Sequence, residues 1–417
     1  MSLIISNGMK SLSKQKTATL NQTSLIQQGL IYDRWLLGAS FTLMLIGLVM
    51  VSSSSVPVAE RLTGQSHYFI FRHGIYLILS LLMGFAVMQV PVRHWKILGP
   101  WLLIGGLILL MLVLVVGRRV NGSQRWLDLG LFTVQVSELV KLFVVIYLAG
   151  YLVRKSTELK TQIQGFLRPL IIMFLVTGLL LKEPDFGASA VIVATVLAMM
   201  FLAGAKLWQF IILTMGIAGT LALVALTPGY RLDRLQSFLD PWKDPYGLGY
   251  QMTQSLIAFG RGGIFGEGLG NSVQKLTYLP EAHTDFVVSI MAEELGFIGI
   301  IFIVVLFIII LSRSLKIGNR ALKNDQPFGG YVAYGLGFGL FVQAMVNIGV
   351  SAGLLPTKGL TLPLVSYGGS SLIISFVTIS LILRIDYETR VKSLGFNSRI
   401  KGRKRVVVRK KSSGGRV

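Results

Sequence analysis

The chain has 417 residues, 53% of them hydrophobic and 14% charged, and its formal net charge is +22. Soluble domains average about 25% charged residues, so the composition excludes an ordinary soluble protein and predicts an all-α integral membrane protein. There is no cysteine, which excludes disulfides, thiolate catalysis and cysteine-ligated zinc. The four histidines are scattered along the chain, so a histidine-rich metal site is not expected.

Apolar runs of about 20 residues mark helices that cross a membrane, and we interpret ten such runs as a polytopic bundle. Their expected ranges are Trp35–Ser55, Gly74–Val90, Leu98–Gly117, Ser137–Val153, Pro169–Leu181, Gly187–Ala205, Leu207–Thr227, Asp285–Leu311, Phe328–Ala352 and Ser366–Leu383. The chain then divides into a basic N-terminal segment (1–34), a ten-span membrane domain (35–385) and a basic tail (386–417).

The first apolar run, followed by "SSSSVPVA", imitates a secretory signal. It is longer than a usual signal core and begins more than thirty residues into the chain, so we interpret it as an uncleaved first span.

Charge sets the expected orientation. With the N-terminus inside, most of the 40 lysines and arginines fall on the inner face, as the positive-inside rule requires, and both termini are cytoplasmic. The acidic residues gather on the outer face, which is where chemistry is expected. The tail "RIKGRKRVVVRKKSSGGRV" lacks interleaved aromatic residues, so anionic lipid rather than nucleic acid is its expected partner.

The outer segment before the fourth span reads "GRRVNGSQRWLDLG" and carries three arginines against the charge trend. Glu138 and Lys141 follow three residues apart, early in the fourth span. One interpretation is a local ion pair. The other is a cationic site, with Arg125 and Lys141, for an anionic group such as pyrophosphate, because arginine offers bidentate contacts and lysine a point charge.

Two further outer segments interrupt the apolar pattern. "KEPDFGAS" separates the fifth and sixth spans with Glu183 and Asp185. Residues 228–284 form the longest internal loop, in which we expect short helices lying at the membrane interface rather than a separate domain.

This loop ends in "LPEAHTDF", which crowds Glu281, His283 and Asp285 at the start of the eighth span. Thr284 and Asp285 are suitable for capping that helix. The alternative is that Asp285 is a general base for a sugar hydroxyl. A helix N-terminus lowers the pKa of a carboxyl, whereas burial and the nearby Glu281 raise it, and the sequence leaves the balance open.

Charged residues also occur within the eighth span and in the segment between the last two spans. Glu293 and Glu294 lie inside the eighth span and are expected to face the interior of the bundle. Either they have a functional role, or one of them pairs with a buried cation and fixes the packing of the helices. Lys358 lies in "LLPTKGLTLPLVSYGGSS", whose prolines and glycines exclude a regular helix. Such backbone lines a cavity or is buried in protein at membrane depth, unless it is an ordinary outer loop.

Together "NGSQRWLDLG", "DPWKDPYGLGYQMTQSLIAFGRGGIFGEGLGNSVQKL", "LPEAHTDF" and "LLPTKGLTLPLVSYGGSS" resemble the SEDS family (shape, elongation, division and sporulation) over Ile31–Arg390. The sequence "GNSVQKLTYLPEAHTDF" resembles the cell-division branch of the family more than the elongation branch. Val136 stands where the family usually has proline. The segment "EPDFGAS" also departs from the motif that is commoner in the family, which leaves the role of Glu183 undefined.

The resemblance implies a ten-span peptidoglycan glycosyltransferase of the bacterial inner membrane, working at the division septum with a class B penicillin-binding protein and other division proteins. Its substrate would be lipid II, a disaccharide-pentapeptide on undecaprenyl pyrophosphate, and Asp285 would be the essential catalytic acid of the family. The expected substrate-binding residues are Arg125, Glu138, Lys141, Glu281, His283 and Lys358.

Other functions remain compatible with the sequence. A lipid II flippase would also use intramembrane acids and broken helices, and a non-catalytic scaffold or an elongation-type polymerase are further alternatives. No cofactor is indicated with certainty; a divalent cation could join the cationic residues, although the sequence shows no clear metal site.

Overall fold

The computed structural model describes residues 32–120, 123–128, 130, 133–213, 215, 240–247, 249–276, 278–356 and 359–412, with side chains of the last helix described to Ser393. Within this part, eight helices are long and apolar enough to cross a membrane, and a ninth, shorter one is equally apolar. They are α2 (Arg34–Thr63), α3 (Tyr68–Gln89), α4 (Val92–Val116), α5 (Val136–Arg154), α7 (Ile163–Lys182), α8 (Phe186–Leu202), α12 (Val287–Lys323), α13 (Pro327–Ser351) and α14 (Gly369–Ser412). The predicted seventh span lies largely outside the described residues.

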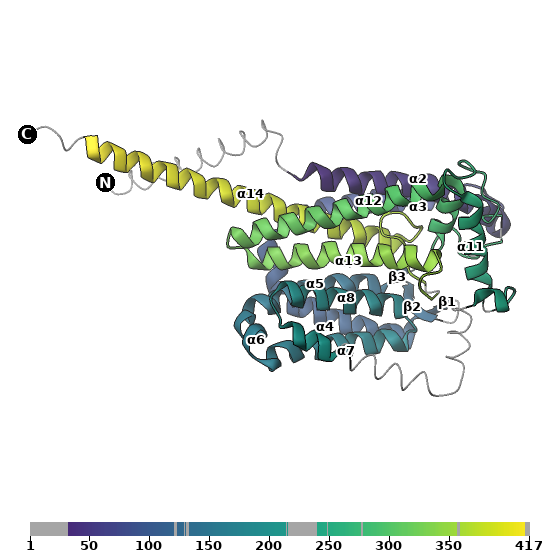
Figure 1. Ribbon diagram of the computed structural model, residues 1–417, viewed down its shortest axis with the longest axis horizontal. Helices are drawn as coiled ribbons and strands as arrows, with labels where there is room; N and C mark the ends of the chain where they lie inside the picture. The colour runs from purple at the N-terminus through teal and green to yellow at the C-terminus, as the bar shows by residue number, and fades with distance from the viewer. Residues whose placement is uncertain are drawn as a thin grey trace, which may run out of the picture.

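The helices lie side by side along the long axis of the molecule (Figure 1). Helix α12 packs along α13 and α2, α14 packs along α3, and α5 packs between α4 and α13. The short helix α11 (Tyr250–Gly262) lies at one end, and α6 (Ser156–Thr161) lies at the other. The prediction of a polytopic helical bundle is therefore confirmed, and α11 is a short helix of the kind expected in the long loop.

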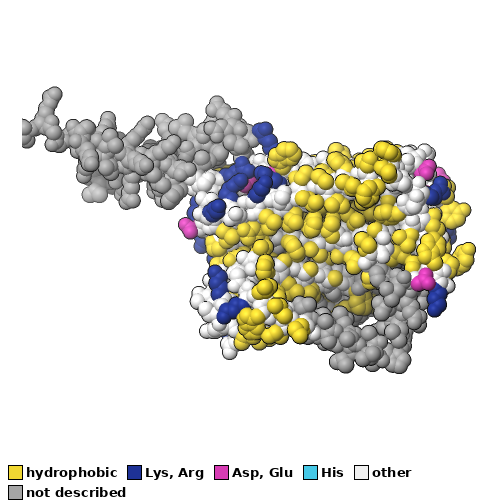
Figure 2. Space-filling model, viewed as in Figure 1, with side chains coloured by type: hydrophobic (Ala, Val, Ile, Leu, Met, Phe, Trp, Pro, Cys, Tyr) yellow, Lys and Arg dark blue, Asp and Glu magenta, His cyan; other side chains and the backbone are white. Residues whose placement is uncertain are grey.

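Hydrophobic side chains cover the middle of the bundle, and charged side chains lie toward its two ends (Figure 2). Phe71, Trp101 and Val115 are among the large apolar side chains that are mostly exposed. Such an apolar band is what a lipid-facing surface requires, because lipid satisfies apolar groups and penalises charge.

A small antiparallel sheet lies at the α11 end, where no strands were predicted. Strand β2 (Ser123–Asp128) pairs with β1 (Arg118–Val120) on one side and β3 (Thr133–Gln135) on the other. Trp126 is opposite Arg118 in one ladder and opposite Gln135 in the other. The sheet joins the ends of α4 and α5 and presents Arg125 from its central strand.

At the opposite end, buried ion pairs join three helices that are distant in sequence. Asp33 caps α2 and accepts hydrogen bonds from Arg313 of α12, and Asp386 of α14 pairs with Arg320 of α12 at 2.7 Å. Arg390 lies 2.7 Å from Asp386 and 3.9 Å from Asp33. Helix α14 runs without a break through the predicted tail boundary at residue 386.

Helix α12 is broken at Gly296, whose φ of 69° and ψ of −171° are not helical. The chain after α11 fills the break: Phe297 and Ile298 donate backbone hydrogen bonds to Gly263 and Ile264. Glycine is suited to this position because its φ lies in the left-handed region and a side chain there would collide with the inserted backbone. The two residues after the break are thereby fastened to the chain that follows α11.

The two intramembrane acids secure the same insertion. Glu294 accepts hydrogen bonds from Lys275 at 2.7 Å and from Ser53 of α2, and Glu293 lies 3.3 Å from Arg261 of α11 and accepts from the Val273 amide. Both acids are fully buried. Their contacts therefore support the packing interpretation, in which each acid is paired with a cation and fixes the loop against α12.

We expect Lys275→Met to lower the free energy of unfolding by about 3–5 kcal/mol, because it leaves Glu294 buried without its cation. Adding Glu294→Gln should recover part of the loss. Thermal unfolding in detergent measures both changes. Lys155→Met, which removes a partly exposed pair with Glu158, is the matched control and should change stability by less than about 1 kcal/mol. An equal loss in both single variants would contradict the role given to Lys275.

Candidate functional site

Asp285 lies in a turn ahead of α12 rather than in its first turn. The helix begins at Val287, Phe286 occupies the N-cap position, and no side chain caps it. Thr284 instead donates its hydroxyl to the backbone oxygen and to Oε2 of Glu281, at 3.2 and 2.7 Å. The prediction that Thr284 and Asp285 cap this helix is therefore wrong, because Glu281 engages the threonine and tightens the turn.

The Asp285 carboxylate and the Arg125 guanidinium both border Gly359, and we refer to the place where these three residues meet as the recess. A Cβ added to Gly359 would come within 3.0 Å of Asp285 Oδ2 and 3.2 Å of an Arg125 guanidinium nitrogen, so both charged groups border the same glycine. The aspartate is half-buried. Replacing Gly359 with a larger residue would fill this space, which identifies the glycine as one wall of the recess.

Arg125 reaches the recess from the central strand β2. Its guanidinium donates hydrogen bonds to the backbone oxygens of Glu183 and Pro184, which form the turn between α7 and α8. Asp185 follows this turn and caps α8 through the Ala188 amide at 3.1 Å. Arg125 therefore holds the turn that brings Asp185 toward Asp285.

Burial and the neighbouring charged groups set the protonation states of Asp285 and Glu183. Burial, and after it the carboxylates of Glu281 and Asp185, raise the pKa of Asp285 to about 7 against the opposing charge of Arg125. Burial and Asp185 raise the pKa of Glu183 to about 8. Both Glu183 carboxylate oxygens are buried without a hydrogen-bond partner. A carboxyl that titrates near neutral pH is suited to general-base catalysis.

His283 packs in an aromatic cluster with Phe69 and Tyr367. Its ring lies 4.7 Å from that of Phe69 on α3 and 5.5 Å from that of Tyr367, and its backbone oxygen accepts from the Tyr367 amide at 3.0 Å. Burial lowers the pKa of His283, so the ring is held neutral. These contacts fasten the Glu281–Asp285 turn to α3 and to the loop before α14.

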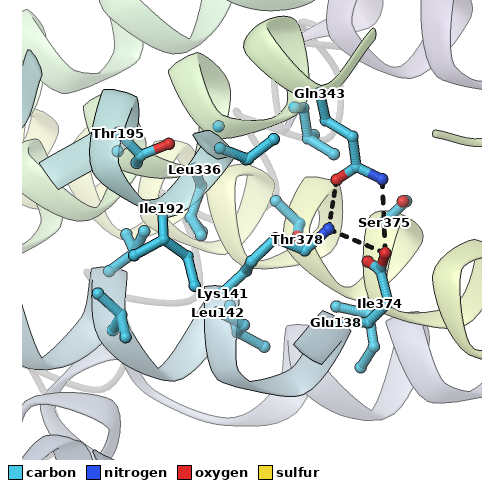
Figure 3. Close-up of a pocket in the computed structure, with 16 residues that line it drawn as sticks. Glu138, Lys141, Leu142, Ile192, Thr195, Leu336, Gln343, Ile374, Ser375 and Thr378 are labelled. Carbon is cyan, nitrogen blue, oxygen red and sulfur yellow. Dashed lines mark hydrogen bonds and ion pairs between the residues drawn. The ribbon is translucent and has the colours of Figure 1, made fainter. Parts of the chain in front are cut away.

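Glu138 and Lys141 form the predicted ion pair at 2.9 Å, and both side chains are largely buried. Figure 3 shows that Gln343 of α13 completes the group: it accepts from Lys141 at 2.5 Å and donates to Glu138 at 3.5 Å. The three side chains line one end of a pocket between α5, α8, α13 and α14, whose other walls are mostly apolar.

The predicted site residues therefore fall into two neighbouring places. Arg125 and Glu281 influence Asp285 directly, whereas Glu138 and Lys141 line the adjacent pocket. Lys358 lies outside the described residues, so the predicted convergence of three cations stays a prediction. Among the described residues, no group of three or more histidine and acidic side chains is arranged to hold a metal ion.

Sequence reasoning did not include Asp185 or Gln343 in the site. The signal for Asp185 was present, since "KEPDF" places two acids at the edge of a membrane span. Gln343 gave a weaker signal, because an uncharged amide within an apolar run has no distinctive spacing to its partners. Both were found only through the contacts between α5, α13 and the α7–α8 turn.

The sequence matches the family model described as cell cycle protein, FTSW_RODA_SPOVE, over residues 34–391. A relative from Alteromonas naphthalenivorans, named probable peptidoglycan glycosyltransferase FtsW, is 53% identical over 362 residues, covering 86% of this chain and 70% of the relative.

Solved structures show the same similarity. A chain from a peptidoglycan synthase complex, described as coordinating polymerization and crosslinking, superposes with a TM-score of 0.72 at 28% identity, covering 86% of this chain and 99% of that chain. The rod shape determining protein RodA of Thermus thermophilus gives a TM-score of 0.63 at 29% identity, covering 86% and 97%.

The raised pKa of Asp285 predicts a pH-dependent stability difference for Asp285→Asn. An ionised carboxylate in this recess costs stability, and that cost is complete above the folded pKa of about 7 and disappears as pH falls toward the ordinary value of 3.8. The variant should therefore melt at a higher temperature than the wild type at pH 8, and the gap should shrink by pH 5. Thermal unfolding across this range measures the difference.

Asp128→Asn is the control, because Asp128 belongs to an exposed pair with Arg118. The difference in melting temperature between Asp128→Asn and the wild type should not change comparably with pH. A gap for Asp285→Asn that stays constant from pH 5 to pH 8 would show that the recess does not penalise the charged carboxylate.

Proposed function

This chain belongs to the SEDS family of cell cycle proteins, and on that premise we propose that Asp285 is the general base with which it works as a peptidoglycan glycosyltransferase. The protein is a multi-pass membrane enzyme of this class, as its relatives and its apolar helices indicate. The observation that carries the catalytic assignment is the recess in which Asp285 and Arg125 border Gly359. It lies outside the spanning helices, at the end of the bundle where the acids gather.

The proposed substrate is lipid II, and the reaction needs one proton acceptor. A sugar hydroxyl of one lipid-linked saccharide attacks the anomeric carbon of another, a new glycosidic bond forms, and the bond to the pyrophosphate breaks. Asp285 takes the hydroxyl proton, and the lipid pyrophosphate leaves as an anion. A carboxyl with a pKa near 7 is ionised often enough to accept that proton and basic enough to drive its transfer.

Arg125 is the cation that we assign to the departing pyrophosphate. Its guanidinium borders the same glycine as the Asp285 carboxylate, and arginine matches phosphate oxygens bidentately. Substrate contacts by Glu281, His283 and Lys358 remain predictions. A divalent cation that arrives with the substrate would add to this positive charge. The carboxylates described above would then be its candidate ligands.

The proposed partner is a class B penicillin-binding protein, and the proposed location is the division septum. Support comes from two sources: a similar chain occurs in a peptidoglycan synthase complex, and the FtsW-named relative at 53% identity is considerably closer than RodA at 29%. Partner binding would place a crosslinking enzyme beside the recess that extends the glycan strand.

Polymerisation of labelled lipid II by the purified full chain with its partner tests the assignment. We expect Asp285→Asn to reach normal membrane levels and to lose on the order of 10²–10⁴-fold in rate, the usual contribution of a general base. Asp128→Asn, on the nearby sheet, should retain wild-type activity. Near-normal glycan synthesis by Asp285→Asn would remove Asp285 from the mechanism, and transbilayer movement of lipid II without polymerisation would favour the flippase.

Orientation has its own test. A reporter fused after Val417 should be cytoplasmic and one inserted beside Lys243 should be periplasmic. The basic residues concentrate at the end from which α14 projects, whereas Lys243 ends a short 3₁₀ helix (Pro241–Lys243) that packs against α11 at the other end. The opposite location at either position would place the recess on the wrong side of the membrane for a lipid-linked saccharide presented outside.

A further inference from the structure

Helix α13 directs a row of polar side chains into the protein interior near the recess. Gln343, Asn347 and Ser351 follow one another at four-residue intervals, so they share one face of the helix. Their exposed fractions are 3%, 2% and 0%. Buried polar side chains in a membrane bundle are costly unless they are hydrogen-bonded. Asn347 is bonded to Asp285 itself, and Gln343 is bonded to the loop that carries Gly359.

Asn347 joins two segments that meet at the recess. Its Nδ2 donates to the backbone oxygen of Asp285 at 2.8 Å and to the backbone oxygen of Leu360. Both partners are carbonyl oxygens, so the amide NH₂ group is required and both of its protons are used. The asparagine thus ties the catalytic turn to the loop that carries Gly359.

Gln343 holds the next carbonyl of the same loop. Its Nε2 donates to the Thr361 backbone oxygen at 3.2 Å, while its Oε1 accepts from Lys141 at 2.5 Å. Glu138 in turn binds Lys141 at 2.9 Å (Figure 3). Two side-chain amides one helical turn apart, those of Gln343 and Asn347, therefore donate hydrogen bonds to two consecutive backbone carbonyls. The Glu138–Lys141 pair orients the Gln343 amide.

We propose that Gln343 and Asn347 are positioning residues that hold Asp285 against the Gly359 wall, and that Lys141 acts through Gln343 rather than on the pyrophosphate. The proposal rests on the catalytic assignment of Asp285. Asn347 is too buried to meet a lipid-linked saccharide, and the Lys141 ammonium already has a carboxylate and an amide oxygen as partners. What these side chains control is the position of the aspartate relative to Arg125.

The position matters because proton transfer requires close alignment of the base with the attacking hydroxyl. A displacement of about 1 Å from a change remote from the reacting atoms can cost about 100-fold in rate. Asn347 is the stronger of the two links, since it contacts the backbone of Asp285 itself. Gln343 acts one step further away, on the opposing wall.

Asn347→Leu tests the proposal in the full chain, purified with its partner and assayed with labelled lipid II. Leucine is similar in size and cannot donate to either carbonyl. We expect about a 100-fold fall in kcat with little change in KM, and a shifted midpoint in the pH–rate profile, because Asp285 changes its distance from Arg125 and Asp185. If Asn347→Leu does not fold, Asn347→Asp keeps the shape, loses the paired donors and carries the same expectation.

Thr389→Val is the matched control. It removes a partly buried hydrogen bond of 2.7 Å between Thr389 of α14 and Gln326 at the other end of the bundle, so it tests loss of stability alone. It should lower stability and leave kcat and the pH midpoint unchanged. Wild-type kcat in a folded Asn347 variant, or a fall in kcat with an unchanged midpoint, would overturn the positioning role.

The link to Lys141 is tested by a double-mutant cycle of Lys141→Met and Gln343→Leu. If the lysine acts through the glutamine, the double variant should be about as impaired as the worse single variant. Additive losses would show that Lys141 acts independently, as a pyrophosphate contact would. If the wild type itself fails to polymerise lipid II, the proposed function fails; if it polymerises and the variants match it, only this inference fails.

Discussion

The α11 end of the molecule is organised around one carboxyl group that is kept partly out of water beside like charges. Asp285 is close enough to Glu281 and Asp185 to be destabilised as an anion, and close enough to Arg125 to remain accessible to ionisation. A capping aspartate would have the opposite character, because a helix N-terminus favours the charged form. Keeping Asp285 ahead of α12, in a separate turn, therefore preserves its basicity.

Such a group is stable only if the surrounding backbone cannot relax away from it. Three supports meet there: Arg125 holds the α7–α8 turn, His283 fixes the Glu281–Asp285 turn among Phe69 and Tyr367, and Asn347 binds the Asp285 backbone. Behind them, the break at Gly296 is locked by the inserted chain after α11. The ion pairs at the opposite end join α2, α12 and α14, so the bundle that carries these supports is tied at both ends.

Much of this organisation could be predicted from the sequence. Spanning helices are long apolar runs, so their presence was visible, and the crowded acids of "LPEAHTDF" indicated the site. The sheet was missed although Asn121-Gly122, a strong hairpin signal, separates β1 from β2 in the sequence. The start of α12 was misplaced by two residues because Thr284 and Asp285 fit a cap, and only the contact with Glu281 decides against it. Gln343 and Asn347 could not be predicted, since their importance depends on which carbonyls α13 meets in space.

The central claim concerns the protonation of Asp285, and its infrared carboxyl band reports it most directly. Subtracting the spectrum of Asp285→Asn from that of the wild type at each pH isolates the protonated carboxyl of this residue. The account predicts a band that is present at pH 5 and disappears with a midpoint near 7. Disappearance near the ordinary aspartate value of 3.8, with no band left at pH 5, would contradict it, because Asp285 would then be a solvated carboxylate too weak to act as the proposed base.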